Sequence, residues 1–399
     1  MIKISSILNP KKLNDVIISL TLMTPAILVF FRSAFLVESN IASSFIAVAL
    51  MVLLLLYCFS RPKNRIKASS IFLAVSLFLV LAASLFFYTG VDYSLAQFGF
   101  YILVPLLVSQ QEFNIQNVLK NIMVLSIPLF FATDSMLELE NVGLNQADMY
   151  STYSFIPSII ATFIYIIYYR KKLDKFTILG CLLNIYYCVR VALTATRGFW
   201  LVVAVFIFFV ILLYIKQKAN KKTYLLVAIL LFSVLTTIML NASSIISAVS
   251  NIIGDNAGGQ AGIFIKTKHL SESSDILNGR AELWSQSIEW ISKNPIFGNG
   301  FGSTARLYGN ELYLYPHNLF LQLMQDCGLI IATYPMFIII YAIVSLTKKG
   351  KQTEAQNITV LFLVSITIPI LFFSNDIWKN SALWLLIGYG IYLRGSKNE

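Results

Sequence analysis

One of the two histidines in this 399-residue chain, His317, begins an amphipathic segment at the edge of a predicted membrane span. Pro316, just before it, suits the first position of a helix, so we expect a helix N-terminus here. The partial positive charge of a helix N-terminus disfavours imidazolium. A neutral imidazole near pH 7 can accept a proton from a hydroxyl nucleophile, which makes His317 a candidate general base. A surface or capping histidine is the other interpretation, and it is the one we expect for His269, which has no comparable setting.

Three arginines are candidates for binding an anion. Arg190 falls within the apolar stretch 176–194, and Arg197 lies where that helix should emerge on the external side. The two are about two helical turns apart, so both should point roughly the same way. An arginine at a helix centre costs about 2.5–3.5 kcal/mol on insertion scales, so it usually lines a polar cavity or meets an anion; snorkelling to the surface is the alternative. Arg280 either binds an anion or pairs with a carboxylate such as Glu282.

The chain that must position these residues is mostly lipid-soluble. It is 57% hydrophobic and only 12% charged, which is too apolar for an ordinary soluble domain. A membrane span needs about 20 mostly apolar residues, and twelve segments qualify, which predicts an all-α polytopic membrane protein. They lie near 15–32, 41–59, 69–88, 94–109, 117–133, 152–169, 176–194, 198–215, 223–242, 328–346, 358–374 and 380–394.

Lysine and arginine concentrate in alternate connecting segments, beginning with the N-terminal one. The positive-inside rule makes these segments cytoplasmic, and an even number of spans returns both termini to the cytoplasm. The net charge of +11 therefore reflects topology, and nucleic-acid binding is not favoured. The cations that fall outside these segments are Arg32, Arg190, Arg197, Lys266, Lys268, Arg280, Lys293, Arg306 and Lys379.

One external connection, between the ninth and tenth spans, is far longer than the others. Connections of this length usually have structure and function of their own. We therefore expect spans one to nine over 1–242, an external loop with the catalytic segment over 243–327, and spans ten to twelve with a cytoplasmic C-terminus over 328–399.

Helical spacing within that loop predicts a helix over 279–291. Leu283, Ile288 and Ile291 are its expected buried positions, and Asn294-Pro295 should end it. The glycines of the following Phe-Gly-Asn-Gly-Phe-Gly run permit a tight turn that bulkier residues would not.

Motifs for metal or nucleotide chemistry are missing from the sequence. There is no HExxH, DxD or Walker-type glycine loop, so we expect neither a metal nor another cofactor, although Asp255 and Glu311 stay open as isolated ligands. The cysteines have no CxxC spacing and are expected to be small core residues. Energy for a reaction outside must then arrive with the substrate. A polyprenyl-diphosphate donor would suit, because its tail dissolves in the bilayer and arginine forks hold its diphosphate.

Four short motifs, taken in order, resemble those of the O-antigen ligase superfamily, which also contains surface-polysaccharide polymerases. Each is weak alone, but together they span about 190–330 around the long external loop. They are Thr194-Ala195-Thr196-Arg197-Gly198-Phe199-Trp200, Gly279-Arg280-Ala281-Glu282-Leu283-Trp284, Asn294-Pro295-Ile296-Phe297-Gly298-Asn299-Gly300, and His317-Asn318-Leu319-Phe320-Leu321-Gln322 with Gly328.

The resemblance implies a glycosyltransferase of the bacterial inner membrane that works without metal, by inversion, on the periplasmic face. In such ligases the donor is an undecaprenyl-diphosphate-linked glycan, and the acceptor is lipid A–core of lipopolysaccharide. Carried onto this chain, His317 would be the general base, and Arg197 and Arg280 would hold the diphosphate. Arg190 would join them on the strength of its helix position alone.

Two other functions stay open from the sequence. A polysaccharide polymerase would use the same chemistry with a second lipid-linked glycan as acceptor, and the single long loop late in the chain favours the ligase. A polysaccharide transporter or flippase would be expected to have repeated halves and interrupted helices with polar groups near the bilayer midplane. Here the unusual residues cluster towards one face.

Overall fold

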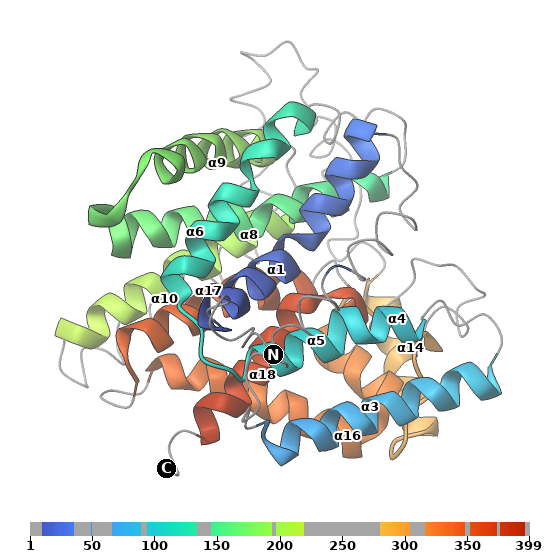
Figure 1. Cartoon of the computed structure of the whole chain (residues 1–399). Helices are drawn as coiled ribbons and strands as arrows, with labels where there is room; N and C mark the ends of the chain where they lie inside the picture. Colours follow the sequence, from blue (N-terminus) through green and yellow to red (C-terminus); the bar gives the residue numbers. More distant parts are fainter. Residues whose placement is uncertain are drawn as a thin grey trace, which may run out of the picture.

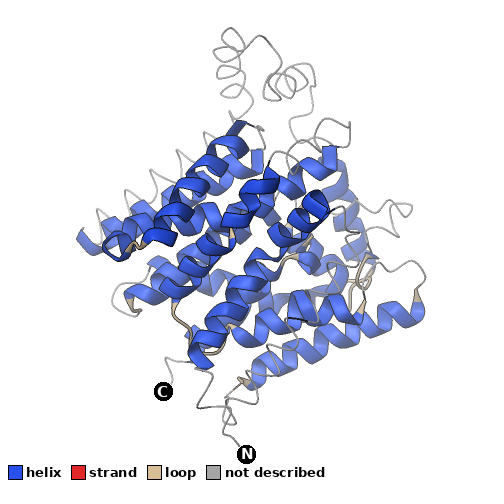
Figure 2. Ribbon diagram, turned by 45° about the horizontal axis from the view of Figure 1, so that its top comes forward, coloured by secondary structure: helices blue, strands red, loops and turns tan. Residues whose placement is uncertain are grey.

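A computed structural model of the chain describes residues 10–35, 49, 66–88, 94–133, 145–193, 197–218, 280–303, 316–347, 352–372 and 376–395. Within these residues every regular element is a helix and none is a strand (Figure 2), which confirms the all-α prediction. The longer helices are α1 (Pro10–Phe35), α3 (Ala68–Phe87), α6 (Ile115–Leu125), α8 (Asn145–Tyr169), α9 (Lys175–Leu193), α10 (Arg197–Lys218), α14 (Arg280–Lys293), α16 (Leu319–Thr347), α17 (Glu354–Leu371) and α18 (Ser381–Gly395). Shorter pieces are α4 (Leu95–Phe98), η2 (Gly99–Leu103), α5 (Val104–Val108), η3 (Ile127–Ala132), η5 (Arg170–Lys172) and η6 (Ile377–Lys379).

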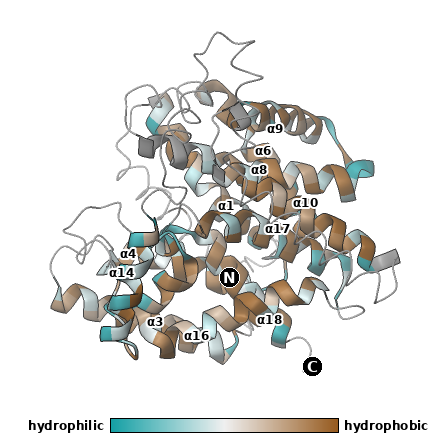
Figure 3. Ribbon diagram, turned by 180° about the vertical axis from the view of Figure 1, so that it is seen from behind, coloured by the Kyte–Doolittle hydropathy of each residue, from teal (hydrophilic) through white to brown (hydrophobic). Residues whose placement is uncertain are grey.

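Seven helical stretches among the described residues are long and apolar enough to cross a membrane, so the protein is a multi-pass membrane protein. Hydrophobic residues cover most of the helix lengths, and hydrophilic ones gather at helix ends (Figure 3). Of the twelve predicted spans, 41–59 and 223–242 lie outside the described residues. The span predicted at 94–109 is a shorter apolar helix, Leu95–Val108. The helices at the predicted spans 176–194 and 380–394, α9 and α18, are not among the seven. The seven are Lys11–Ala34, Ala68–Phe87, Ile115–Ala132, Thr152–Lys172, Gly198–Lys216, Leu319–Thr347 and Glu354–Leu371.

The helices are arranged with many of their cations at one end of the bundle. Lys11 pairs with Glu112 at the start of α6 (2.7 Å). The Lys172 ammonium donates to Gln116 Oε1 at the same place (2.9 Å), and the Lys216 ammonium donates to the Leu346 carbonyl near the end of α16 (2.8 Å). We call this the cationic end. The opposite end, where α16 begins, is called the site end.

Two apolar clusters form the core of the described bundle. The larger one joins α1, α6, α8, α9, α10 and α17. The second lies under the site end and joins α3, the first turns of α16, η6 and α18 around Phe301, Trp378 and Trp384. The rings of Phe301 and Trp378 stack at 3.9 Å between centroids. Leu319 and Leu323, in the first turns of α16, belong to the same cluster as this aromatic stack.

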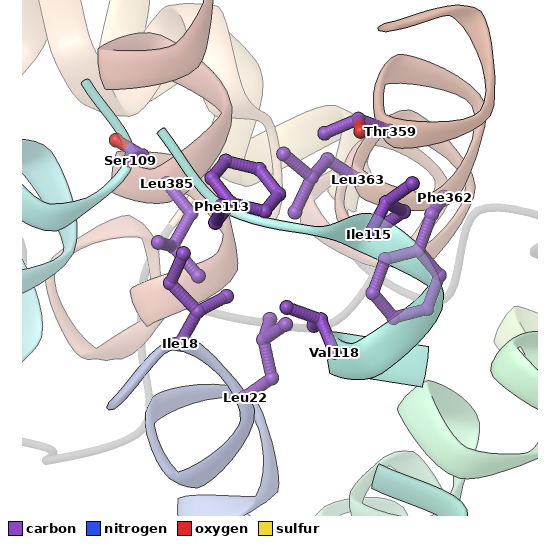
Figure 4. Close-up of a pocket in the computed structure, with 10 residues that line it drawn as sticks. All are labelled: Ile18, Leu22, Ser109, Phe113, Ile115, Val118, Thr359, Phe362, Leu363 and Leu385. Atoms are coloured by element: carbon purple, nitrogen blue, oxygen red, sulfur yellow. The ribbon is translucent and has the colours of Figure 1, made fainter. Parts of the chain in front are cut away.

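A small void lies inside the larger cluster, between α1, α6, α17 and α18 (Figure 4). Its lining is apolar apart from the hydroxyls of Ser109 and Thr359, and none of its lining side chains is titratable. We assign it no chemistry.

The predicted tenth span, from residue 328, is the later part of a longer helix. Helix α16 starts nine residues earlier, at Leu319, and Gly328 (φ 69) interrupts its helical backbone. A left-handed residue breaks the helical hydrogen-bond ladder and bends the chain. The first turns of α16 are thus a separate segment that carries site residues, and the span proper follows the bend.

Candidate active site

The backbone at His317 is set by the residue that follows it. Asn318 caps α16, because its Oδ1 accepts hydrogen bonds from the amides of Phe320 (3.1 Å) and Leu321 (3.2 Å). His317 itself has a positive φ of 48°, which is uncommon for a residue with a side chain. Pro316 therefore lies two residues before the cap, and its predicted place as the first helical residue is wrong. The cap side chain, rather than the proline ring, starts the helix.

Helix α14 holds the peptide just before His317. The Trp284 indole N–H donates to the Pro316 carbonyl at 2.7 Å, and Pro316 is buried. Arg280 is four residues before Trp284, so the two side chains share one face of α14. This places the guanidinium charge beside His317, where it acts electrostatically on the imidazole. The structure therefore brings together two predicted site residues that are far apart in sequence.

The imidazole of His317 is neutral at pH 7, as expected from the sequence, but for a different main reason. Burial lowers its pKa from 6.5 to about 4, and the positive charge of Arg280 contributes the second, smaller part. Removing a group from water disfavours its charged form, and a nearby cation does the same to a second cation. A neutral imidazole is in the right state to take a proton.

The buried face of α14 is the predicted one only in part: Leu283 and Ile291 are partly buried, but Ile288 is not. Ile288 is 58% exposed, whereas Ser287 is fully buried. The face turned inward therefore runs through Arg280, Trp284 and Ser287, because the contact with Pro316 sets the rotation of the helix. The predicted end of this helix is confirmed, since α14 stops at Lys293, directly before Asn294-Pro295.

The predicted glycine turn is confirmed, and its backbone packs closely against α16 at the bend. Gly298, Gly300 and Gly302 all have positive φ. A Cβ on Gly298 would lie 2.4 Å from the Gly328 nitrogen, and one on Gly328 would lie 2.2 Å from the Ile296 oxygen. Both positions are therefore limited to glycine by close backbone approach as well as by φ.

A buried polar network next to this turn was not predicted. The carboxylate of Asp326 accepts hydrogen bonds from the Ser303 hydroxyl and from the Trp378 indole N–H, the latter at 2.6 Å. The Gln325 amide donates to the Ser303 hydroxyl (3.1 Å). Three segments thus meet at one carboxylate that is only 1% exposed. The one sequence signal for it is an acidic residue in an otherwise apolar run.

Arg190 and Arg197 do not share one helix as predicted. Helix α9 ends at Leu193, and Arg197 begins α10, so the chain reverses between them. The Arg190 guanidinium donates to the Tyr186 hydroxyl on its own helix (3.2 Å). Helices α9 and α14 lie on different sides of the molecule (Figure 1), and no described contact joins Arg190 to His317. The side chain of Arg197 lies outside the described part of the structure.

The glycine of the Thr-Arg-Gly motif does have a visible role. A Cβ on Gly198 would lie 2.2 Å from the Tyr153 hydroxyl oxygen. Gly198 therefore allows α8 to approach the first turn of α10. This close contact positions the backbone directly after Arg197.

The fold and this site define a multi-pass membrane protein with a neutral histidine and an arginine beside it at one end of the bundle. Residues 179–336 match a family model described as O-Antigen ligase. This segment includes all four motifs and the His317–Arg280 pair, and the match supports the resemblance to the O-antigen ligase superfamily. Members of that family are glycosyltransferase-like enzymes that act on lipid-linked glycans. No curated protein matches the chain.

Proposed function

We propose that the protein is an O-antigen ligase. It transfers a glycan from undecaprenyl diphosphate to lipid A–core in lipopolysaccharide biosynthesis, by metal-independent inverting transfer on the periplasmic face of the inner membrane. The observation that carries the proposal is the pairing of a neutral, partly buried His317 with Arg280 inside the matched segment. The cations gathered at the opposite end of the bundle support a periplasmic site, with both termini cytoplasmic.

In the proposed step the acceptor hydroxyl oxygen attacks the anomeric carbon from the side opposite the diphosphate. His317 takes the hydroxyl proton as the new glycosidic bond forms. The bond from the anomeric carbon to the phosphate oxygen breaks, and its electron pair leaves with the diphosphate. Configuration at the anomeric carbon inverts, because attack and departure occur on opposite faces.

Arg280 has two effects in this scheme. Its guanidinium stabilises the charge that grows on the departing diphosphate. Its positive charge also keeps the pKa of His317 low, and an imidazole with a pKa of about 4 is a weaker base than one matched to neutral pH. A bound diphosphate offsets the cation and raises the pKa of His317. The base thus gains strength when the donor is in place.

Arg197 is proposed as the second diphosphate ligand, carried at the start of α10 by the Gly198 contact with Tyr153. The donor-binding role predicted for Arg190 stays a prediction that no described contact supports.

Reconstitution tests the proposed reaction and separates it from polymerisation. Purified protein in proteoliposomes is given undecaprenyl-diphosphate glycan with lipid A–core, or with donor alone. Glycosylated lipid A–core supports the ligase, and lengthened donor supports the polymerase instead. No product with either, under conditions in which an established enzyme of this class works, contradicts both.

A further inference from the structure

Two large apolar side chains project from the glycine turn outside the spans. Phe297 is 75% exposed and Ile296 is 52% exposed. Nothing in the proposed chemistry uses them. Scattered single exposed apolar residues need no explanation, but a contiguous apolar patch marks a contact surface.

The turn that presents them is held in one place by backbone hydrogen bonds. The Gly298 amide donates to the Asn294 carbonyl (3.1 Å), which closes the turn. The Leu329 amide donates to the Pro295 carbonyl (2.8 Å), and the Asn299 amide donates to the Gln325 carbonyl (2.8 Å). Together with the close contact between Gly298 and Gly328, these bonds fix the turn against the bend of α16.

The turn therefore lies level with the start of the span. Leu329 and Ile330, the first residues after the bend, are 46% and 64% exposed on a helix that crosses the membrane. The hydrogen bond from Leu329 places Ile296 and Phe297 beside this lipid-facing surface.

Helix α3 ends at the same level. The Phe301 amide donates to the Ser84 hydroxyl at 2.8 Å. Phe86 and Phe87, just beyond Ser84, are 84% and 72% exposed. Exposed apolar residues of three segments thus lie near the site end: Phe86, Phe87, Ile296, Phe297, Leu329 and Ile330.

The residues that precede the turn suit a membrane interface. The Lys293 ammonium lies 4.2 Å from the centroid of the Trp290 ring. Tryptophan and lysine gather where headgroups meet acyl chains, since each has an apolar body and a polar tip. Helix α14 would then rest at the headgroup level with the turn below it.

We propose that the Ile296–Phe297 turn is a membrane anchor whose side chains insert among the acyl chains of the lipid bilayer. Lipid is the expected contact of these side chains, because the turn extends the lipid-facing surface of α16 and α3. The anchor fixes one end of α14 at the membrane. Arg280 begins the other end of the same helix, so the anchor also sets the height of the site above the bilayer.

Spin labels of known depth test the proposal on the whole protein. Single cysteines for a nitroxide replace Phe297 (Phe297→Cys), Ile330 (Ile330→Cys) as the bilayer reference, and Ser285 (Ser285→Cys) as an exposed control on α14. The native cysteines are first replaced. Each variant is reconstituted in phosphatidylcholine vesicles without any polyprenyl lipid, and accessibility to oxygen and to a water-soluble nickel chelate is measured by power saturation.

The anchor predicts that the label at 297 behaves like that at 330, accessible to oxygen and shielded from nickel, whereas the label at 285 is open to nickel. Nickel access at 297 equal to that at 285 would overturn it. Shielding that disappears when the protein is diluted in lipid would also overturn it, because a second copy would then be the cover. So would shielding that needs added undecaprenyl diphosphate. None of these readouts depends on enzymatic activity, so they are distinct from any failure of the proposed function. A label in place of Ile296 (Ile296→Cys) repeats the test if the first variant does not fold.

Discussion

Replacing Arg280 by glutamine should raise the pKa of His317, but only part of the way to its ordinary value. The pKa is lowered from 6.5 to about 4, and burial is the larger of the two causes. The cation therefore accounts for less than half of the difference, or less than about 1.2 pKa units at about 1.4 kcal/mol per unit. This upper limit equals the energy between two unit charges roughly 10 Å apart at an effective dielectric constant of about 20.

Histidine NMR measures this directly. The chain has only two histidines, so ring signals from protein labelled at histidine are easily assigned with a His269→Asn variant. We expect His317 to titrate near 4 in the wild type and in Arg280→Lys, which keeps the charge. In Arg280→Gln it should titrate between about 4 and about 5.2.

The same titration tests the proposed effect of the donor. Inorganic pyrophosphate added to the wild type should raise the pKa of His317, and it should raise it less in Arg280→Gln, which has lost one of the two proposed ligands. An unaltered titration in Arg280→Gln would refute the electrostatic coupling between the two residues. A rise to 6.5 would refute burial as the main cause.

Three further outcomes follow from the same geometry. Because the pKa of His317 is lower in the folded protein than in the unfolded one, the unfolded protein binds more protons between pH 6.5 and about 4. The free energy of unfolding should therefore fall by on the order of 3 kcal/mol as the pH drops through this window. Unfolding in SDS–detergent mixtures at a series of pH values measures this loss, which should vanish in His317→Gln. Trp284→Phe removes the donor to the buried Pro316 carbonyl and should cost about 1–3 kcal/mol in the same unfolding assay; a change below about 0.3 kcal/mol would show that α14 does not hold this turn. Gly328→Ala adds a Cβ 2.2 Å from the Ile296 oxygen at a positive φ and should cost more than about 1 kcal/mol, whereas alanine at Gly99, with nothing within 4 Å, should not.

The sequence was informative where local chemistry decides the outcome. Apolar length predicted the helices, Asn294-Pro295 predicted the end of α14, and the glycine run predicted the tight turn. These features depend on the preferences of residues close together in the chain.

Features that depend on tertiary contact were missed or misplaced. The rotation of α14 is set by the indole contact with Pro316. The start of α16 is a local feature that was misplaced, because the helix begins at the Asn318 cap and not at Pro316. The Asp326 network needs Ser303 and Trp378, which approach it only in the fold. The seven-residue spacing of Arg190 and Arg197 predicted that they share one helical face, but they lie on two different helices, α9 and α10.

Single-turnover transfer by His317→Ala tests the central claim most directly. Wild type, His317→Ala and the matched control His269→Ala are reconstituted with lipid-linked glycan and acceptor, and product is quantified after confirming equal insertion in the membrane. The account predicts a loss of about 10²–10⁴-fold in the transfer rate for His317→Ala, with donor binding retained and His269→Ala close to wild type. A transfer rate for His317→Ala within a few fold of the wild type would contradict it.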